Sequence, residues 1–289
     1  MDLAQRSQLM TCATIASVAT ALLLIVVKVI AWHMTSSLSI LATLVDSIMD
    51  AVASLITLIA VRISLTPADD EHRFGHGKAE YLSVLMQAVF ISGSAIILLL
   101  QAVKRLASDT APVVNENIGV AVMVISIAAT TGLLVFQRYV VRRTGSTAIA
   151  ADAMHYKVDL LTNMAVIIAL MTAAAGYPSM DSFLTIAIAV YMLTGVVKLV
   201  WEAIQHLMDH SLPPEQLEEI ERRCLSVPGV ISVHEIRTRV SGQIPFIQMH
   251  LDLSGELPLR EAHDIGYQAK QALLEWLPDA DIIVHLDPD

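Results

Sequence analysis

The sequence predicts an α-helical membrane protein, with six transmembrane helices followed by a small cytosolic α+β domain. Hydrophobic residues make up 55% of the 289 residues, and the mean hydropathy of +0.62 is too high for a soluble domain of this size. From Asp209 onward the chain instead shows the patterns of a water-soluble fold. We therefore divide the chain into a transmembrane domain, residues 1–208, and a cytosolic domain, residues 209–289.

Six apolar stretches are each long enough to cross about 30 Å of hydrocarbon at about 1.5 Å per residue. They are residues 11–32, 38–61, 81–103, 118–136, 147–175 and 182–204. The first is not expected to be a cleavable signal peptide, because it is long and no small-residue cleavage motif follows it. Lys28 and Lys198, in the first and last stretches, are expected to snorkel or to pair inside the protein.

Basic residues in the loops predict the orientation. One set of loops, together with the N-terminus, holds Arg6, Arg62, Arg73, Lys78, Arg138, Arg142 and Arg143. The opposite loops hold only Lys104 and Arg105. By the positive-inside rule the first set is cytoplasmic, so both termini of a six-span protein in the inner (plasma) membrane face the cytoplasm.

Two pairs of ionisable residues with the same spacing lie inside the second and fifth stretches. Asp46 and Asp50 are four residues apart, as are His155 and Asp159. Residues at i and i+4 share a helix face, and ionisable groups at bilayer depth are costly unless something compensates them. Two such faces turned toward each other would present three carboxylates and an imidazole, which together suit a divalent cation such as zinc. The alternative is a hydrogen-bonded polar cluster without an ion.

The C-terminal stretch predicts a two-layer fold in the order α-β-β-α-β. The expected elements are a helix from Pro214, strands at 230–240 and 244–253, a helix at 259–276 and a strand at 281–286. This stretch holds six Lys or Arg against fifteen Asp or Glu, and so nine of the ten net negative charges. Such a surface disfavours nucleic acid and anionic lipid, and raises the local concentration of cations.

Histidines give two further candidate metal sites. In the C-terminal domain the candidate ligands are His234, His250, His263, His285 and Asp287, where one bridging carboxylate could hold two ions. In the loop between the second and third stretches they are Asp69, His72 and His76. For each set the alternative is a solvated surface without metal.

Taken together, these motifs resemble the cation diffusion facilitators, and are most similar to the bacterial branch of ferrous-iron and zinc efflux pumps. The shared features are Asp-x3-Asp, His-x3-Asp, the loop His-x-Phe-Gly-His-Gly-Lys-Ala-Glu, six spans and a histidine-bearing C-terminal domain. The resemblance implies a homodimeric antiporter that exports zinc, cadmium or ferrous iron in exchange for protons, with a cytosolic ferredoxin-like (metallochaperone-like) α+β domain. It also implies a salt bridge between Lys78 and Asp209 where the protomers meet. Close relatives have a polar residue where this chain has Leu286, so a second cytosolic ion that uses that side chain would lose one ligand or replace it with a backbone carbonyl or water.

Two other classes of protein are weighed against a transporter. An intramembrane metal-dependent enzyme would need an open coordination position and a general base, and no His-Glu-x2-His motif occurs. A membrane-anchored metal sensor would not need carboxylates in two separate spans.

Overall fold

The computed structural model describes residues 3–36, 38–108, 117–174 and 180–289. The chain divides into two compact units. The first comprises residues 1–65 and 79–203, and the second comprises residues 66–78 and 204–289. The loop at 66–78 therefore groups with the C-terminal domain, although the predicted boundary at residue 208 assigns it to the membrane domain.

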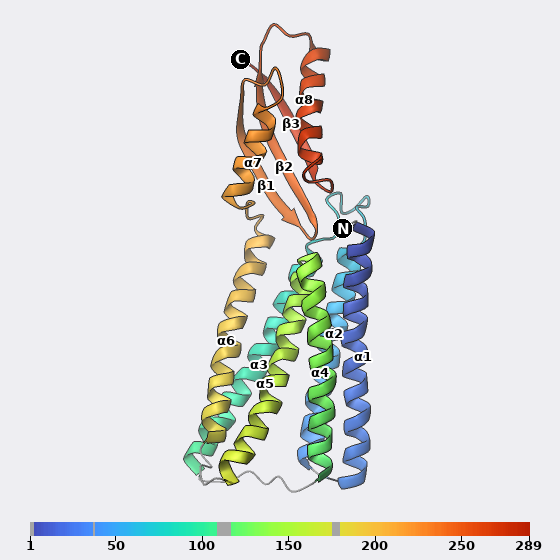
Figure 1. Cartoon of the computed structure of the whole chain (residues 1–289), viewed down its shortest axis with the longest axis vertical. Coiled ribbons are helices and arrows are strands. Elements are labelled where there is room, and N and C mark those ends of the chain that lie inside the picture. Colours follow the sequence, from blue (N-terminus) through green and yellow to red (C-terminus); the bar gives the residue numbers. More distant parts are fainter. Residues whose placement is uncertain (1–2, 37, 109–116, 175–179) are drawn as a thin grey trace. The chain divides into compact units, whose positions relative to one another are not determined.

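Six long helices run beside one another in the first unit (Figure 1). They are α1 (Leu3–Thr35), α2 (Leu38–Ser64), α3 (Ala79–Ser108), α4 (Asn117–Thr144), α5 (Thr147–Ala174) and α6 (Met180–Leu207). Each contains one of the six predicted stretches, apart from the end of the fifth, which lies outside the described residues. Most helices extend beyond the apolar stretch, since a helix continues through polar residues until a terminating signal.

Five described helices are long and apolar enough to cross a membrane: α1, α2, α3, α4 and α6. The fifth predicted span, α5, is not among them and carries the charged residues Asp152, Lys157 and Asp159. Large apolar side chains are exposed on the outside of the helices, for example Leu22, Val89 and Val197. In a helical unit of this size, such a surface is typical of lipid contact.

The start of α5 is fixed by a carboxylate from α3. Glu80 is buried, and its carboxylate accepts hydrogen bonds from the hydroxyl of Ser146 and the backbone N–H of Ala148. These contacts cap free N–H groups in the first turn of α5. They therefore set where α5 begins, and so determine the position of each α5 side chain along the axis of the helix.

The C-terminal unit has the predicted order of elements. They are α7 (Pro214–Leu225), β1 (Ser232–Ser241), β2 (Ile244–Leu253), α8 (Leu259–Leu274) and β3 (Asp281–Pro288). The sheet order is β1-β2-β3, with β1 antiparallel and β3 parallel to β2. In Figure 1 both helices lie against this sheet.

One face of the sheet forms the core and the other remains polar. Ile247, Met249 and Leu251 alternate along β2 and pack with buried residues of α7 and α8. The core also contains Cys224, whose Sγ lies 3.6 Å from the sulfur of Met249. Residues at odd and even positions of a strand point to opposite faces, so His250 points away from this core.

Candidate metal centre

Asp50, His155 and Asp159 converge between α2 and α5, and we call them the helix cluster. One possible ligand atom from each lies within 4.8 Å of the others. His155 Nε2 is 2.8 Å from Asp50 Oδ1 and 3.8 Å from Asp159 Oδ2. The His155 side chain is 8% exposed, against 16% for Asp50 and 34% for Asp159. Two carboxylates and an imidazole in this arrangement can bind a divalent transition metal once the imidazole is neutral.

Asp46, the fourth predicted ligand, lies outside this cluster. It precedes Asp50 by one turn of α2, and residues four apart are separated by about 6 Å along a helix axis. Asp46 is not among the residues whose possible ligand atoms all lie within 4.8 Å of one another. The structure thus brings together three of the four predicted ligands, and a role for Asp46 stays a prediction.

A lysine of α1 pairs inside the helix bundle near these residues. Lys28 Nζ donates hydrogen bonds to Ser47 Oγ at 2.6 Å and to the carbonyl oxygen of Thr43 at 3.0 Å. Ser47 directly follows Asp46 on α2. Of the two predictions for Lys28, interior pairing is therefore confirmed. Its positive charge offsets part of the repulsion among the nearby carboxylates.

Sequence reasoning overlooked two charged residues of α5. Asp152 is 1% exposed and lies one turn before His155. Lys157 donates a 2.5 Å hydrogen bond to the hydroxyl of Tyr191 on α6. Both are visible in the sequence as ionisable residues within an apolar stretch. They were missed because only ligand pairs four residues apart were considered, and neither residue belongs to one.

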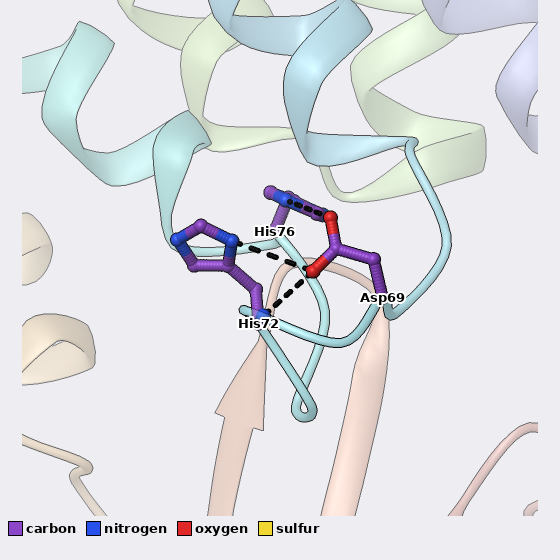
Figure 2. A group of neighbouring side chains, drawn as sticks. All are labelled: Asp69, His72 and His76. Atoms are coloured by element: carbon purple, nitrogen blue, oxygen red, sulfur yellow. Dashed lines mark hydrogen bonds and ion pairs between the residues drawn. The ribbon is translucent and has the colours of Figure 1, made fainter.

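Asp69, His72 and His76 form a second group, the loop cluster, shown in Figure 2. Asp69 Oδ1 lies 3.5 Å from His72 Nδ1, and Asp69 Oδ2 lies 3.4 Å from His76 Nε2. The two imidazole rings are 4.6 Å apart between centroids. All three predicted ligands of the loop therefore come together, with one carboxylate between two imidazoles.

Backbone contacts hold Asp69 in this position. Asp69 Oδ1 accepts hydrogen bonds from the backbone N–H groups of His72 at 2.6 Å and Glu71 at 3.0 Å (the bond to His72 is drawn in Figure 2). Gly75 turns the loop back with a φ of +76°, a conformation that suits glycine. The hydrogen bond from His72 lowers the pKa of Asp69 below its usual range, against a smaller opposing effect of desolvation. Asp69 is thus kept in the ionised form that binds metal.

The loop packs on the turn of the β1–β2 hairpin. A Cβ on Gly77 would lie 2.5 Å from the backbone carbonyl of Ser241, so only glycine fits there. The rings of Phe74 and Phe246 meet edge to face at 5.7 Å, and the Arg239 guanidinium lies over both. The loop cluster is therefore fixed to the sheet within the second unit.

Two ion pairs that share Asp209 hold the end of the same loop. Lys78 Nζ is 2.9 Å from Asp209 Oδ1, and Arg239 Nη1 is 3.4 Å from Asp209 Oδ2. The resemblance implied the pair of Lys78 and Asp209, and the structure contains it within one protomer. Desolvation raises the pKa of Asp209, but the hydrogen bond and charge of Lys78, with those of Arg239, outweigh it and lower the pKa overall.

His234, His250 and Asp287 form the third group, the sheet cluster, on the polar face of the sheet. His234, His250 and His285 are paired directly across the three strands. Asp287 Oδ2 lies 2.7 Å from His250 Nδ1 and 3.5 Å from His234 Nε2. Asp287 Oδ1 lies 3.1 Å from His285 Nε2. Asp287 can thus bridge two ions, one bound by each of its oxygens.

One further acidic residue, Asp252, lies beside the sheet cluster, and one predicted ligand, His263, lies outside it. Asp252 Oδ1 lies 3.2 Å from His234 Nε2, and Ser232 also donates a hydrogen bond to the Asp252 carboxylate. His263 lies on α8 with its side chain 76% exposed, outside the sheet cluster. Leu286 packs into the apolar core beside Gly266. Its side chain therefore contributes nothing to the metal site, and a role for His263 stays a prediction.

Comparison with known proteins identifies the family. A cation efflux transmembrane domain matches residues 14–208, and a cation efflux protein cytoplasmic domain matches residues 212–289. The chain belongs to the cation efflux family, the cation diffusion facilitators. Its members transport divalent metal cations across membranes, so the predicted resemblance is confirmed and the enzyme alternative is wrong.

Individual members of the cation efflux family match nearly the whole chain. Cation-efflux pump FieF of Shigella boydii serotype 18 is 45% identical over 281 residues, which cover 97% of this chain and 93% of that protein. The FieF protein of Escherichia coli O1:K1 matches with the same identity and coverage. The structure of CzrB in its Zn form is 30% identical, covers 28% of this chain and 93% of that chain, and has a TM-score of 0.26.

Proposed function

We propose that the protein exports zinc, and with it cadmium or ferrous iron, from the cytoplasm in exchange for protons. The observation that supports this most is the helix cluster, which places two carboxylates and an imidazole in the middle of an apolar helix bundle. Ionisable groups in that setting mark a pathway for ions more often than a structural contact. Asp46 completes the proposed transport site as a fourth ligand.

Exchange with protons follows from the chemistry of these ligands. A metal ion binds the deprotonated carboxylates and the neutral imidazole, so binding releases protons and protonation releases the metal. Export of a divalent cation against the membrane potential costs about 2.3 kcal/mol per charge for each 100 mV. Inward flow of protons supplies free energy that can offset this cost.

The proposed architecture is a homodimer with six spans per protomer and both termini in the cytoplasm. We include α5 as a span because it is as long as its neighbours and carries its charged residues toward other helices. The cytosolic domain, residues 209–289, is proposed to be ferredoxin-like. Its excess of negative charge would hold two such domains apart when they are empty, and bound cations would reduce that repulsion.

The loop cluster and the sheet cluster are proposed to bind metal for regulation. Both lie in the water-soluble unit, whose described elements include no helix of spanning length other than the end of α6. An ion bound there has no route through the bilayer. Such an ion can still change the conformation or dimerisation of the unit, and thereby the transport rate.

Flux in proteoliposomes tests the proposal. Purified protein is reconstituted, zinc is added outside, and uptake is followed with a fluorescent indicator trapped inside, with and without a pH gradient. The proposal requires that zinc uptake rises when the vesicle interior is more acidic than the medium, so that protons flow outward. It also requires that the external medium is acidified as zinc enters. A sensor would bind zinc without any flux, and zinc uptake insensitive to the gradient would contradict the proton exchange.

A further inference from the structure

Asp152 is a buried carboxylate without a basic partner among the described residues that contact it. It is 1% exposed and accepts hydrogen bonds from side chains of four other helices, including Ser17 of α1. Ser54 Oγ on α2 donates at 3.2 Å and Gln87 Nε2 on α3 at 3.3 Å, both to Oδ1. Gln137 Nε2 on α4 donates at 2.7 Å to Oδ2. A buried charge of this kind is tolerated only where such donors replace water.

A second set of hydrogen bonds makes further contacts to α1. Tyr156 Oη lies 2.9 Å from Ser54 Oγ and donates to the backbone carbonyl of Ser17 at 3.1 Å. Gln137 Nε2 also donates to Ser17 Oγ at 2.9 Å. We call these residues the Asp152 hub: Ser17, Ser54, Gln87, Gln137, Asp152 and Tyr156. The hub joins the first five helices at one level of the bundle.

The hub lies one helical turn from the helix cluster on both helices that supply its ligands. Ser54 follows Asp50 by four residues on α2, and Asp152 precedes His155 by three residues on α5. Two cross-links therefore connect α2 and α5: Asp50 to His155, and Ser54 to Asp152 and Tyr156. The first consists of metal ligands and must change when an ion or a proton binds. The second contains no ligand of the helix cluster and can persist through that change.

Building on the proposed transport site, we propose that Asp152 is its positioning residue. Through Ser54 and Tyr156 it holds α2 and α5 at the register in which Asp50 faces His155. Zinc–oxygen and zinc–nitrogen distances near 2.0–2.2 Å demand closely placed ligands, so a site without this support loses zinc before it loses a larger ion such as cadmium. The hub therefore contributes both affinity for zinc and discrimination against cadmium.

Conservative variants of full-length protein in proteoliposomes test this role. Ser54→Ala removes one donor without creating a large cavity, and Asp152→Asn keeps the shape but presents an amide N–H group to the donors around it. Both are expected to raise the KM for zinc by about tenfold or more, as loss of a partner that orients a metal ligand does, with a smaller change in kcat. The ratio of the KM for cadmium to that for zinc should fall in both.

A charge exchange within the hub supplies the rescue test. In the double variant Asp152→Asn with Gln137→Glu, the new carboxylate on α4 can accept from the new amide on α5 and from the hydroxyl of Ser17. The amide oxygen at position 152 would still accept from Ser54 and Gln87. The double variant should therefore recover most of the zinc affinity lost in Asp152→Asn. Ser126→Ala is the matched control, because Ser126 is a buried serine of α4 whose Oγ has no hydrogen-bond partner in the described structure.

The absorption spectrum of bound cobalt tests the positioning role without any measurement of transport. Cobalt bound to wild-type protein, minus cobalt bound to Asp159→Ala, gives the visible absorption of the helix cluster alone. If hub variants alter the intensity of this difference spectrum, the positioning role holds even where wild-type protein shows no zinc flux. Unchanged KM, KM ratio and cobalt spectrum in folded Ser54→Ala and Asp152→Asn would overturn it. If Asp152→Asn fails to fold, Ser54→Ala alone tests the proposal. An unchanged KM, KM ratio and cobalt spectrum in Ser54→Ala would then show that the hub is only a packing contact.

Discussion

Asp50 Oδ1 and His155 Nε2 lie 2.8 Å apart, although 105 positions separate the two residues in the sequence. The contact joins α2 and α5 through two atoms that are both potential metal ligands. A proton on Nε2 would be donated to Asp50, and a metal ion that binds Nε2 must displace that proton. Metal and proton thus compete for the same place between the same two helices.

Removing one carboxylate of the helix cluster should abolish transport without unfolding the protein. Asp159→Ala deletes a ligand that is one-third exposed and whose nearest ion-pair partner among the described residues is His155 at 3.8 Å. We expect zinc flux in proteoliposomes to fall to background, while gel filtration and thermal unfolding stay as in wild type. Glu202→Ala, which removes an exposed carboxylate of α6, is the control and should leave the flux unchanged. Near-normal flux in Asp159→Ala would show that the carboxylate has a structural role only.

Replacing the imidazole of the helix cluster should change which metal is preferred. His155→Asp converts a mixed nitrogen and oxygen site into an all-oxygen site, which suits manganese better than zinc. In competition flux assays we expect zinc transport to fall relative to manganese and ferrous iron. An unchanged order of preference would place the determinant of selectivity outside this residue.

Asp69 should have two separable roles in the loop. Asp69→Asn keeps an oxygen that can accept from the N–H groups of Glu71 and His72 but removes the charge, whereas Asp69→Ala removes both. Zinc affinity of the loop cluster should fall by about tenfold or more in each variant. Amide hydrogen exchange in residues 66–78 should rise only in Asp69→Ala. Equal exchange in both variants would mean that the carboxylate oxygen does not hold the loop.

The sheet cluster should regulate transport without carrying the ion. His234→Ala combined with His285→Ala removes one imidazole from each oxygen of Asp287. We expect full-length protein with both changes to lose the zinc-dependent compaction of the cytosolic domain, measured by small-angle scattering. Residual flux should continue through the intact helix cluster. Complete loss of flux in a folded double variant would make the cytosolic ions obligatory for transport.

The stability supplied by Asp209 should disappear only in acid. Its pKa is lower in the folded protein than in the unfolded chain, so its ion pairs stabilise the fold above the unfolded value, about 3.9. That contribution is lost as the pH falls through the lower folded value. The difference in thermal stability between wild type and Asp209→Asn should be constant from pH 7 to about pH 5 and close below about pH 4. A difference that closes near neutral pH would contradict this assignment. Because Asp209 is 38% exposed, the difference should be small.

Local patterns predicted the elements of the cytosolic domain to within a few residues. The alternation of apolar and polar residues predicted strands at 230–240 and 244–253. The structure has strands at Ser232–Ser241 and Ile244–Leu253. This worked because one face of each strand is buried, so burial imposes the period of two directly on the sequence. A bulge at Glu235 was not predicted, since it depends on pairing with a distant strand.

The candidate sites were predictable as residue types but not as geometry. Spacing correctly put Asp50, His155 and Asp159 together, because a helix fixes which side chains share a face. It could not show that Asp46 lies outside this group, because spacing says nothing about how two helices align along their axes. Nor could it find Asp152, whose proposed role depends on donors from four other helices. The contact of Gly77 with the hairpin turn was equally invisible, since the partners are 164 residues apart.

Cys224 gives the cytosolic unit a built-in reporter of its own opening. This residue of α7 is 0% exposed where the helix packs on the sheet, and burial raises the pKa of its thiol to about 11. A thiol reagent attacks only an accessible thiolate, so it can modify Cys224 only in moments when α7 leaves the sheet. Cys12 lies on α1 at the start of the first apolar stretch, so its labelling does not depend on α7. The labelling rate of Cys224 therefore measures how often the apolar face of the sheet is uncovered, and no mutation is needed to read it.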